Sequence, residues 1–259
     1  MSANRGEQHA VPIMMCTDFP LPPDLDAESQ LEARLENPAN IFRRPDPDAP
    51  LEMAVDVRKC WRPGSTLSVC FLERDEILEA KVATFAQLWC KHANIKFIFD
   101  NRSDADIRIA FVAGAGSKSR VGIDARKADP GFATMNLDRS WFRYDYNDRV
   151  LRRTVLHEFG HALGCIHEHQ SPKAGIAWNE KAVFAYYGGP PNNWSTEQIR
   201  FNVLDRYNQP WMNATEFDNH SIMLYPIDAH FTTNGYSVGW NDDLSEKDIS
   251  FIAKMYPFD

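Results

Sequence analysis

The sequence predicts an α+β or α/β fold in which a twisted mixed sheet is backed by two helices and followed by an irregular part that ends in a C-terminal helix. Three observations lead to this prediction. Strand-like and helix-like apolar periodicities alternate from residue 59 to about residue 165, few long periodic segments follow before Ser245, and 44% of the 259 residues are hydrophobic. Such a chain can bury a full core, so we expect one domain over residues 59–259.

The first elements of this domain are predicted from their apolar spacing. Residues 67–72 form a short apolar run that is typical of a strand, and apolar residues recur at helical spacing over 77–89. Alternating apolar residues at 95–99 and at 107–111 have the period of half-buried strands. The order strand, helix, strand, strand therefore precedes the next helix.

Three other segments are interpreted from local chemistry. Residues 133–137 are expected to form an edge strand, which either receives an extended peptide by strand addition or is an ordinary capped edge. The glycine-rich residues 114–118 lack the spacing of a phosphate-binding loop and are predicted to be a turn. Near the end of the chain, Ser245 and Asp248 form a capping-box pattern, which predicts the terminal helix.

The second helix of the domain carries the most informative residues. Apolar residues recur at helical spacing over 150–163, and Asn147 or Asp148 offers an N-cap. His157 and His161 are four residues apart, so they share one face of the helix, and Glu158 lies beside them. This is the arrangement in which two imidazoles bind one zinc ion next to a carboxylate that can act as a general base.

A third ligand is available if the chain turns back after the helix. A catalytic zinc needs three protein ligands and one open position for water, and His167 can complete the set. Gly164 permits the turn, because glycine adopts the left-handed conformation without a Cβ penalty. The spacing therefore predicts a site of His157, His161 and His167 with one Zn²⁺ ion.

The extended zinc signature over 157–167 resembles that of the metzincin metallopeptidases, and the following Glu168 makes it similar to the astacin family. A second motif agrees, since Ser221-Ile222-Met223-Leu224-Tyr225 resembles the methionine turn of astacins. Leu224 departs from the histidine common at that place, which is not a ligand in the family. The resemblance covers residues 59–259 and implies a metzincin catalytic domain, with two long helices above the cleft and an irregular lower subdomain.

The resemblance also implies a mechanism and roles for single residues. The enzyme is expected to be a zinc endopeptidase, in which Glu158 takes a proton from the zinc-activated water and passes it to the leaving amine. Tyr225 is expected to bind the metal in the resting state and then to hydrogen-bond the oxyanion. Met223 is expected to support the histidines from below, and Glu168 either receives the amino terminus of the mature enzyme or is a solvated surface carboxylate.

Residues 1–58 differ from the rest and are interpreted as a leader or prosegment. They are rich in proline and acidic residues, with a short helix expected around 26–35. The first twenty residues do not have the pattern of a signal peptide. As the sequence stands we expect a cytoplasmic protein, although astacin-like enzymes are usually secreted.

The five cysteines are Cys16, Cys60, Cys70, Cys90 and Cys165, an odd number that leaves at least one thiol unpaired. The two disulfides usual in astacins cannot be assigned to these positions. Cys16 lies in the leader, and its thiolate is a suitable zinc ligand that could make the enzyme latent; Asp18 could do the same with a carboxylate. The alternative is a plain structural cysteine.

The net charge and the hydropathy of the chain limit the kinds of partner that it can bind. The net charge of -8 argues against nucleic acid, because binding to phosphates depends on lysine and arginine. No apolar run reaches eighteen residues, so no membrane span is expected. We expect a monomer that acts on peptide or protein substrates, in which Lys173, Arg200 and Arg206 could favour acidic side chains.

Two alternative functions remain at the level of sequence. The same zinc, water and glutamate would serve a hydrolase of non-peptide amides. A zinc-binding recognition protein without catalysis is the other, although such loss usually removes Glu158 or a histidine, and all four residues are present.

Overall fold

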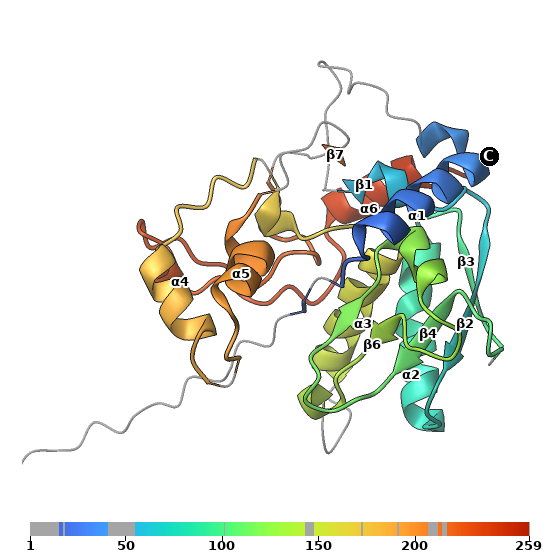
Figure 1. The fold of residues 1–259 in the computed structure, drawn as a ribbon, viewed down its shortest axis with the longest axis horizontal. Coiled ribbons are helices and arrows are strands. Elements are labelled where there is room, and N and C mark those ends of the chain that lie inside the picture. Colours follow the sequence, from blue (N-terminus) through green and yellow to red (C-terminus); the bar gives the residue numbers. More distant parts are fainter. Residues whose placement is uncertain are drawn as a thin grey trace, which may run out of the picture.

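A five-stranded mixed sheet forms the centre of the larger lobe (Figure 1). The computed structural model describes residues 16–17, 19–40, 55–100, 102–142, 148–171, 173–190, 192–206, 212–213 and 217–258. In spatial order the strands are β3 (Lys96–Phe99), β2 (Thr66–Phe71), β4 (Ile107–Ala110), β6 (Met135–Asn136) and β5 (Lys118–Ser119). The first four strands run parallel, as the register pairs Leu67 with Phe97 and Ile109 with Met135 show. The mixed sheet predicted from the sequence is confirmed.

The edge of this sheet differs from the prediction. Residues 133–137 contain β6, but β6 pairs with β4 on one side and with β5 on the other, so it is not an edge strand. β5 runs antiparallel to β6, with Lys118 opposite Asn136. The chain folds back after the 114–118 turn and covers the position that the sequence pattern left open.

Two helices pack on each other and share the main core with the sheet. They are α2 (Glu76–Cys90) and α3 (Asp148–Ala162), both close to the predicted spans. The indole Nε1 of Trp89 on α2 donates to the carbonyl of Leu156 on α3 at 3.0 Å. Phe97 of β3 meets Phe159 of α3 edge to face, with ring centroids 5.0 Å apart. Burial of each such side chain contributes about 1.5–3 kcal/mol, so this core fixes the position of α3.

The end of α3 is formed by Gly164. Its φ of 95° lies in the left-handed region. The Gly164 N–H donates to the carbonyl of His161 at 2.8 Å, and the Cys165 N–H donates to that of Gly160 at 3.0 Å. This pair of bonds is the Schellman motif, which ends a helix and reverses the chain. The predicted turn after the helix is therefore present; the predicted N-cap residue Asn147 lies outside the described residues.

A smaller lobe follows the turn, on the left in Figure 1. It contains α4 (Glu180–Tyr187) and α5 (Thr196–Ile199), which continues into a π-helical turn at Arg200–Leu204. Its apolar cluster includes Val183, Tyr187, Ile199 and Phe231. Most of its chain is irregular, in agreement with the sequence. Two short strands, β1 (Val55–Asp56) and β7 (Met212–Asn213), pair antiparallel.

The chain ends in α6 (Glu246–Met255), which returns to the main core through Phe251 and Ile252. The predicted capping box is present. The Ser245 hydroxyl accepts the N–H of Asp248 at 2.9 Å, and the Asp248 carboxylate accepts the N–H of Ser245 at 2.9 Å. The two bonds satisfy N–H groups that a helix start leaves without partners.

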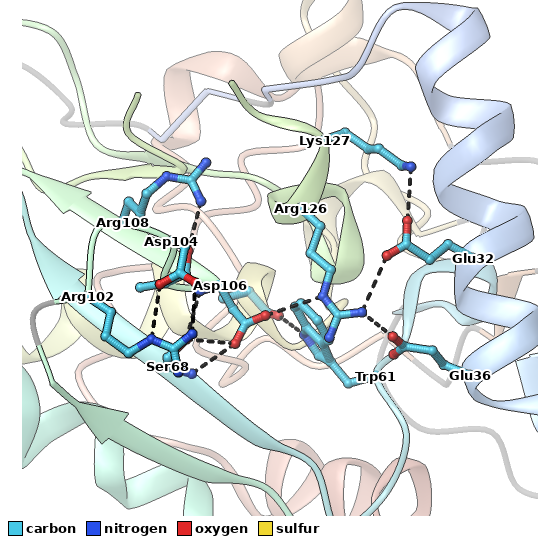
Figure 2. A network of polar contacts seen from close by, with 12 residues as sticks. Glu32, Glu36, Trp61, Ser68, Arg102, Asp104, Asp106, Arg108, Arg126 and Lys127 are labelled. Carbon is cyan, nitrogen blue, oxygen red and sulfur yellow. Dashed lines mark hydrogen bonds and ion pairs between the residues drawn. The ribbon is translucent and has the colours of Figure 1, made fainter. Parts of the chain in front are cut away.

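A helix of the N-terminal segment, α1 (Pro23–Glu36), is attached to the larger lobe by ion pairs. Figure 2 shows Arg126 between Asp106 of the domain and the carboxylates of Glu32 and Glu36 on α1. Lys127 pairs with Glu32 at 2.9 Å, also in Figure 2. The sequence placed this helix correctly, but nothing in the apolar spacing indicated that charged residues would hold it against the domain.

Neither a disulfide nor a membrane-spanning helix occurs among the described residues. All five cysteines lie in this part of the chain, and all are free thiols. None of the described helices is both long and apolar enough to cross a bilayer.

Candidate functional site

The three predicted histidines converge at the end of α3. The Nε2 atoms of His157 and His161 lie 3.2 Å apart, and those of His161 and His167 lie 3.1 Å apart. Helical geometry brings the first two together, and the turn at Gly164 brings the third. The three side chains form, with Cys16, a buried group whose donor atoms lie within 4.8 Å of one another, close enough to share one metal ion.

Each imidazole is oriented by an oxygen at its other nitrogen. Nδ1 of His157 lies 2.8 Å from the carbonyl of Ile222, and Nδ1 of His161 lies 2.9 Å from that of Cys165. Nδ1 of His167 faces the side-chain oxygen of Gln170 at 3.4 Å. A carbonyl or amide oxygen can only accept, so each Nδ1 carries the proton and each Nε2 presents a lone pair to the shared centre. The arrangement fits a zinc ion.

Burial keeps these imidazoles neutral. It lowers the pKa of His157 to about 4 and that of His161 to about 3, and it also lowers the pKa of His167. Loss of hydration disfavours the charged form of an imidazole, and the neighbouring histidines act in the same direction on His161 and His167. At neutral pH all three are therefore in the form that binds a metal.

Glu158 and Cys16 lie at the open side of the histidine group. Glu158 follows His157 on α3 and is only 1% exposed. The thiol of Cys16 donates to Oε2 of Glu158 at 3.5 Å, and its sulfur lies 3.5 Å from Nε2 of His161. The N-terminal segment thus places a sulfur atom between the predicted general base and a predicted ligand.

Tyr225 reaches the same centre from the turn after residue 220. Its hydroxyl lies 2.5 Å from Nε2 of His167 and donates to the carbonyl of Cys16 at 2.5 Å. The phenol therefore contacts both the predicted ligand set and the backbone of the N-terminal segment.

Asp248 stabilises the turn that carries Tyr225 through hydrogen bonds. The Asp248 carboxylate accepts bonds from the Ser221 hydroxyl at 2.7 Å and from the Ile222 N–H at 2.8 Å. Since the Ile222 carbonyl faces His157, Asp248 is linked to the metal site through one residue. Burial raises the pKa of Asp248 to about 6, although its carboxylate accepts three hydrogen bonds.

Met223, predicted as a support of the histidines, is fully buried and lies against Gly160 of α3. A Cβ atom at residue 160 would lie 2.4 Å from the sulfur of Met223 and 3.3 Å from the Trp89 ring. Real Cβ atoms do not approach other atoms at 2.4 Å, so glycine is required for this close packing between α3 and the turn.

We therefore expect Gly160→Ala to destabilise the protein by about 1–3 kcal/mol, which is typical of overpacking in a dense core. The displaced Met223 should also disturb the neighbouring Ile222 carbonyl and weaken zinc binding. Chemical unfolding and zinc titration would measure both effects. Gly239→Ala is a suitable control, because a Cβ at residue 239 meets nothing within 4 Å; equal stability of the two variants would contradict the prediction.

Glu168 is buried, contrary to the surface alternative that the sequence left open. Its Oε1 accepts the N–H of Asp218 at 3.0 Å, while Oε2 has no partner in the described structure. Burial, together with the nearby carboxylates of Asp248 and Asp218, raises the pKa of Glu168 to about 8. A buried carboxyl oxygen without a partner is costly, so this position can receive a donor.

The structure brings together most of the predicted site residues but not all of them. His157, His161, His167, Glu158 and Tyr225 lie together, while Met223 packs against Gly160 of α3 and Gly164 ends that helix. Of the two proposed latency residues Cys16 is in contact with the site, whereas Asp18 lies outside the described residues.

Other predicted or relevant residues lie elsewhere. Among the basic residues considered for substrate preference, Arg200 pairs with Glu180 at 3.7 Å and Arg206 donates to the carbonyl of Ile176 at 3.4 Å. Neither Arg200, Arg206 nor Lys173 lines the hollow next to Glu158, but Arg153 does. Arg153 was missed, although its position four residues before His157 on the same helix face was a usable signal.

Three neutral imidazoles converging on one centre, with a carboxylate beside them, on a helix that backs a mixed sheet, define a zinc metallopeptidase. Comparison with known proteins agrees. Residues 67–174 match the family described as Matrixin. No curated protein matches the sequence.

Two solved structures of one protein are similar to most of this chain. A structure of myroilysin is 41% identical, with a TM-score of 0.76, and covers 80% of this chain and 99% of that chain. A second structure of myroilysin is 39% identical, with a TM-score of 0.58, and covers 77% and 86%. High choriolytic enzyme 1, a hatching enzyme zinc-protease from the medaka fish Oryzias latipes, is 20% identical with a TM-score of 0.47, over 74% and 88%.

This chain therefore belongs to the metzincin zinc metallopeptidases. Its fold is the α+β catalytic domain of that family, and its cofactor is zinc, for which His157, His161 and His167 are the candidate ligands. The class acts on peptide and protein substrates, and the chain is accordingly a zinc-dependent endopeptidase.

Proposed function

We propose that the chain is an astacin-like zinc endopeptidase in which Glu158 is the general base and Tyr225 stabilises the oxyanion. The observation that carries the proposal is the convergence of three Nε2 atoms, with the Glu158 carboxylate beside them. The astacin-like subtype is supported by Glu168 directly after His167 and by the Ser221-to-Tyr225 turn under the site.

The proposed chemistry depends on what each side chain can hold or move. Zinc bound by the three histidines would polarise the scissile carbonyl and acidify a water molecule. Glu158 is placed to take the proton of that water and to donate it to the leaving amine nitrogen. Its burial excludes bulk water, so the proton stays within the site.

Tyr225 supplies a hydrogen-bond donor whose partner changes. In the described structure its hydroxyl donates to a carbonyl oxygen, that of Cys16. We propose that the same hydroxyl donates to the oxyanion of a substrate once the N-terminal segment has left. A donor aimed at charge that appears only in the transition state lowers the barrier selectively.

The direct test is cleavage of a diverse peptide mixture by the full-length protein, read by mass spectrometry, before and after zinc removal by a chelator. We expect cuts within peptides that disappear on chelation and return when zinc is added. No cleavage by zinc-loaded protein, with Cys16 intact or replaced by alanine, would refute the proposed activity and favour a hydrolase of non-peptide amides or a binding protein.

We further propose that residues 1–58 are an inhibitory prosegment with Cys16 as the blocking ligand. Its described residue Cys16 lies beside the histidine group and Glu158, where a substrate is expected to bind. The Thr17 N–H donates to the carbonyl of Ser117 next to β5 at 3.3 Å, and Arg120 donates to the carbonyls of Phe19 and Pro20 at 2.7 Å. Thr17, Phe19 and Pro20 are thus bonded next to β5 at the edge of the sheet, where an extended peptide could bind in their place.

The side chains of the segment strengthen this attachment. The guanidinium of Arg120 stacks 3.6 Å from the centre of the Phe19 ring. Further along, Lys59 pairs with Asp26 of α1 at 2.7 Å and with Asp124 at 2.5 Å. The sulfur of Cys16 is thereby held among the histidines, where a thiolate would take the position that the catalytic water needs.

Cys16→Ala in the full-length chain is expected to raise peptidase activity about tenfold or more. Each 1.4 kcal/mol removed from the closed state increases the open fraction roughly tenfold, and a thiolate ligand to zinc contributes at least that much. Initial rates on one fluorogenic peptide would measure the change, with Asp18→Ala tested in parallel.

Cys90→Ala is the matched control, since Cys90 lies on α2 and outside the histidine group. It should leave the rate unchanged. If Cys16→Ala has the same activity and zinc stoichiometry as the natural chain, the role of Cys16 in latency is refuted while the peptidase proposal stands.

Glu168 has a proposed role in the enzyme after removal of the prosegment. Its partnerless Oε2 atom is suited to receive the new amino terminus after the prosegment is removed, because an ammonium group would both donate a hydrogen bond and lower the pKa of the carboxyl.

A further inference from the structure

The third candidate ligand is oriented differently from the other two. Backbone carbonyls face Nδ1 of His157 and of His161, whereas Nδ1 of His167 faces the side-chain amide of Gln170. Gln170 ends the 3₁₀ turn that starts after His167, and in such a turn the side chains of residues three apart lie one above the other. The direction of the His167 imidazole therefore depends on what holds the Gln170 amide.

The Gln170 amide is held by two carbonyls of the smaller lobe. Its Nε2 atom donates to the carbonyl of Phe201 at 2.7 Å and to that of Asp205 at 3.1 Å. Both hydrogens of the amide nitrogen are thereby used, so the amide oxygen is the atom that faces His167. Gln170 is only 2% exposed, so bulk water does not compete for these bonds.

The two carbonyls belong to the π-helical turn at Arg200–Leu204 and to the residue after it, where α5 of the smaller lobe ends (Figure 1). The N–H of Asp205 donates to the carbonyl of Arg200, five residues back, at 2.8 Å. A helix leaves its last carbonyls without partners inside the helix. Here the residues that follow His167 supply the missing donors, so the end of this helix and the metal site satisfy each other.

A second side chain makes the same connection. Nε2 of His169 donates to the carbonyl of Asn202, also in the π-helical turn, at 3.0 Å. The His169 ring is buried, with its centroid 4.6 Å from that of Tyr225 and 5.4 Å from that of His167. Consecutive side chains thus join the π-helical turn to two of the aromatic rings at the metal site.

We propose that the π-helical turn at Arg200–Leu204 is a functional part of the zinc site, and that Gln170 is the positioning residue through which this turn fixes the His167 imidazole. A ligand held in its binding orientation before the ion arrives loses less freedom on binding, so the smaller lobe increases zinc affinity. The inference concerns metal binding and goes beyond the proposed peptidase reaction.

Gln170→Met tests the role of the amide, because methionine has a similar length but none of the amide donors or its oxygen. We expect the Kd of the full-length chain for zinc to rise about 10–100-fold, as is typical when the group that orients a ligand is lost. Competition with a chromophoric chelator measures the Kd. The visible spectrum of the cobalt-substituted protein should also change, since it reports the geometry of the ligands.

Asn136→Leu is the matched control for a general loss of stability. Asn136 is also a buried amide whose nitrogen donates to two backbone carbonyls, those of Val112 at 3.3 Å and of Gly116 at 2.6 Å, but it lies on β6. This variant should be less stable to denaturant while its zinc Kd and cobalt spectrum stay those of the natural chain. An unchanged Kd in Gln170→Met, or an equal loss of affinity in Asn136→Leu, would overturn the inference.

A measurement on the natural chain decides the matter even if Gln170→Met does not fold. Coupling between two sites is reciprocal, so zinc must stabilise the π-helical turn if the turn strengthens zinc binding. Hydrogen–deuterium exchange with and without zinc should therefore slow in peptides over residues 200–206 more than in α4, which carries none of the carbonyls that His169 and Gln170 bind.

An equal effect of zinc on both segments, or no effect on residues 200–206, would refute the link between the turn and the metal. Both experiments read metal binding and use no substrate. Failure of the peptidase proposal would therefore produce neither refuting result, and the two proposals are tested separately.

Discussion

Glu158→Gln is expected to reduce kcat by roughly 10²–10⁴-fold, the range typical for loss of a general acid–base group. Glutamine preserves the size and the hydrogen-bonding capacity of the side chain but cannot take a proton from water at neutral pH. The group of potential metal ligands does not include Glu158, so the zinc content should remain that of the natural protein. Peptide turnover in the Cys16→Ala background and metal analysis of the same samples measure the two quantities.

Measuring peptide turnover and zinc content in the same samples distinguishes loss of the general base from loss of the metal. Loss of activity with loss of zinc would show a structural effect and would not support the assigned role. Retention of more than about a tenth of the activity with full zinc occupancy would contradict it directly. Glu246→Gln removes an exposed glutamate at the start of α6 and should change neither activity nor metal content.

Asp248→Ala is expected to lower the free energy of unfolding by about 3 kcal/mol or more. The carboxylate accepts hydrogen bonds from the Ser221 hydroxyl and from the backbone N–H groups of Ile222 and Ser245. The substitution leaves these donors without their acceptor, and each buried donor without a partner costs about 1–3 kcal/mol. For a domain of this size the melting temperature should fall by about 6–12 °C.

The same substitution should weaken zinc binding, because the Ile222 carbonyl that orients His157 loses its support. Loss of such indirect support typically lowers metal affinity by about 10–100-fold. Asp243→Ala is the control: its side chain is 59% exposed, and its removal should change stability by at most about 0.5 kcal/mol. An Asp248→Ala protein as stable as this control would refute the role given to the buried carboxylate.

The parts of the site that the sequence predicts well are those determined by local geometry. His157 and His161 share a face because a helix repeats every 3.6 residues, whatever surrounds it. Gly164 ends the helix because few other residues adopt its backbone conformation, and the structure has φ at 95° there. The capping box of α6 is equally local, since both of its bonds join residues three apart.

Contacts between distant segments could not be predicted in this way. The position of 133–137 within the sheet depends on β5 folding back over it, and a two-residue strand has no periodicity to recognise. The oxygens that orient His157 and His161 are backbone carbonyls, which every residue type possesses. The sequence therefore predicts ligands better than it predicts what positions them.

Substrate preference shows the same limit. Basic residues are visible in the sequence, but which of them lies near the zinc site depends on the packing of Trp240, far along the chain, against α3. Asp248 is similar: its capping role is local, whereas its bond to Ser221 joins residues 27 apart.

The reactivity of the five free thiols can report whether the N-terminal segment still covers the metal site. Cys90 is partly exposed, while Cys16, Cys60, Cys70 and Cys165 are buried, and burial raises the pKa of Cys60 to about 12. A chromogenic thiol reagent should therefore titrate one fast-reacting sulfur per chain while the N-terminal segment is seated. Departure of that segment frees Cys16 and brings the count to two, so opening can be timed without any substrate.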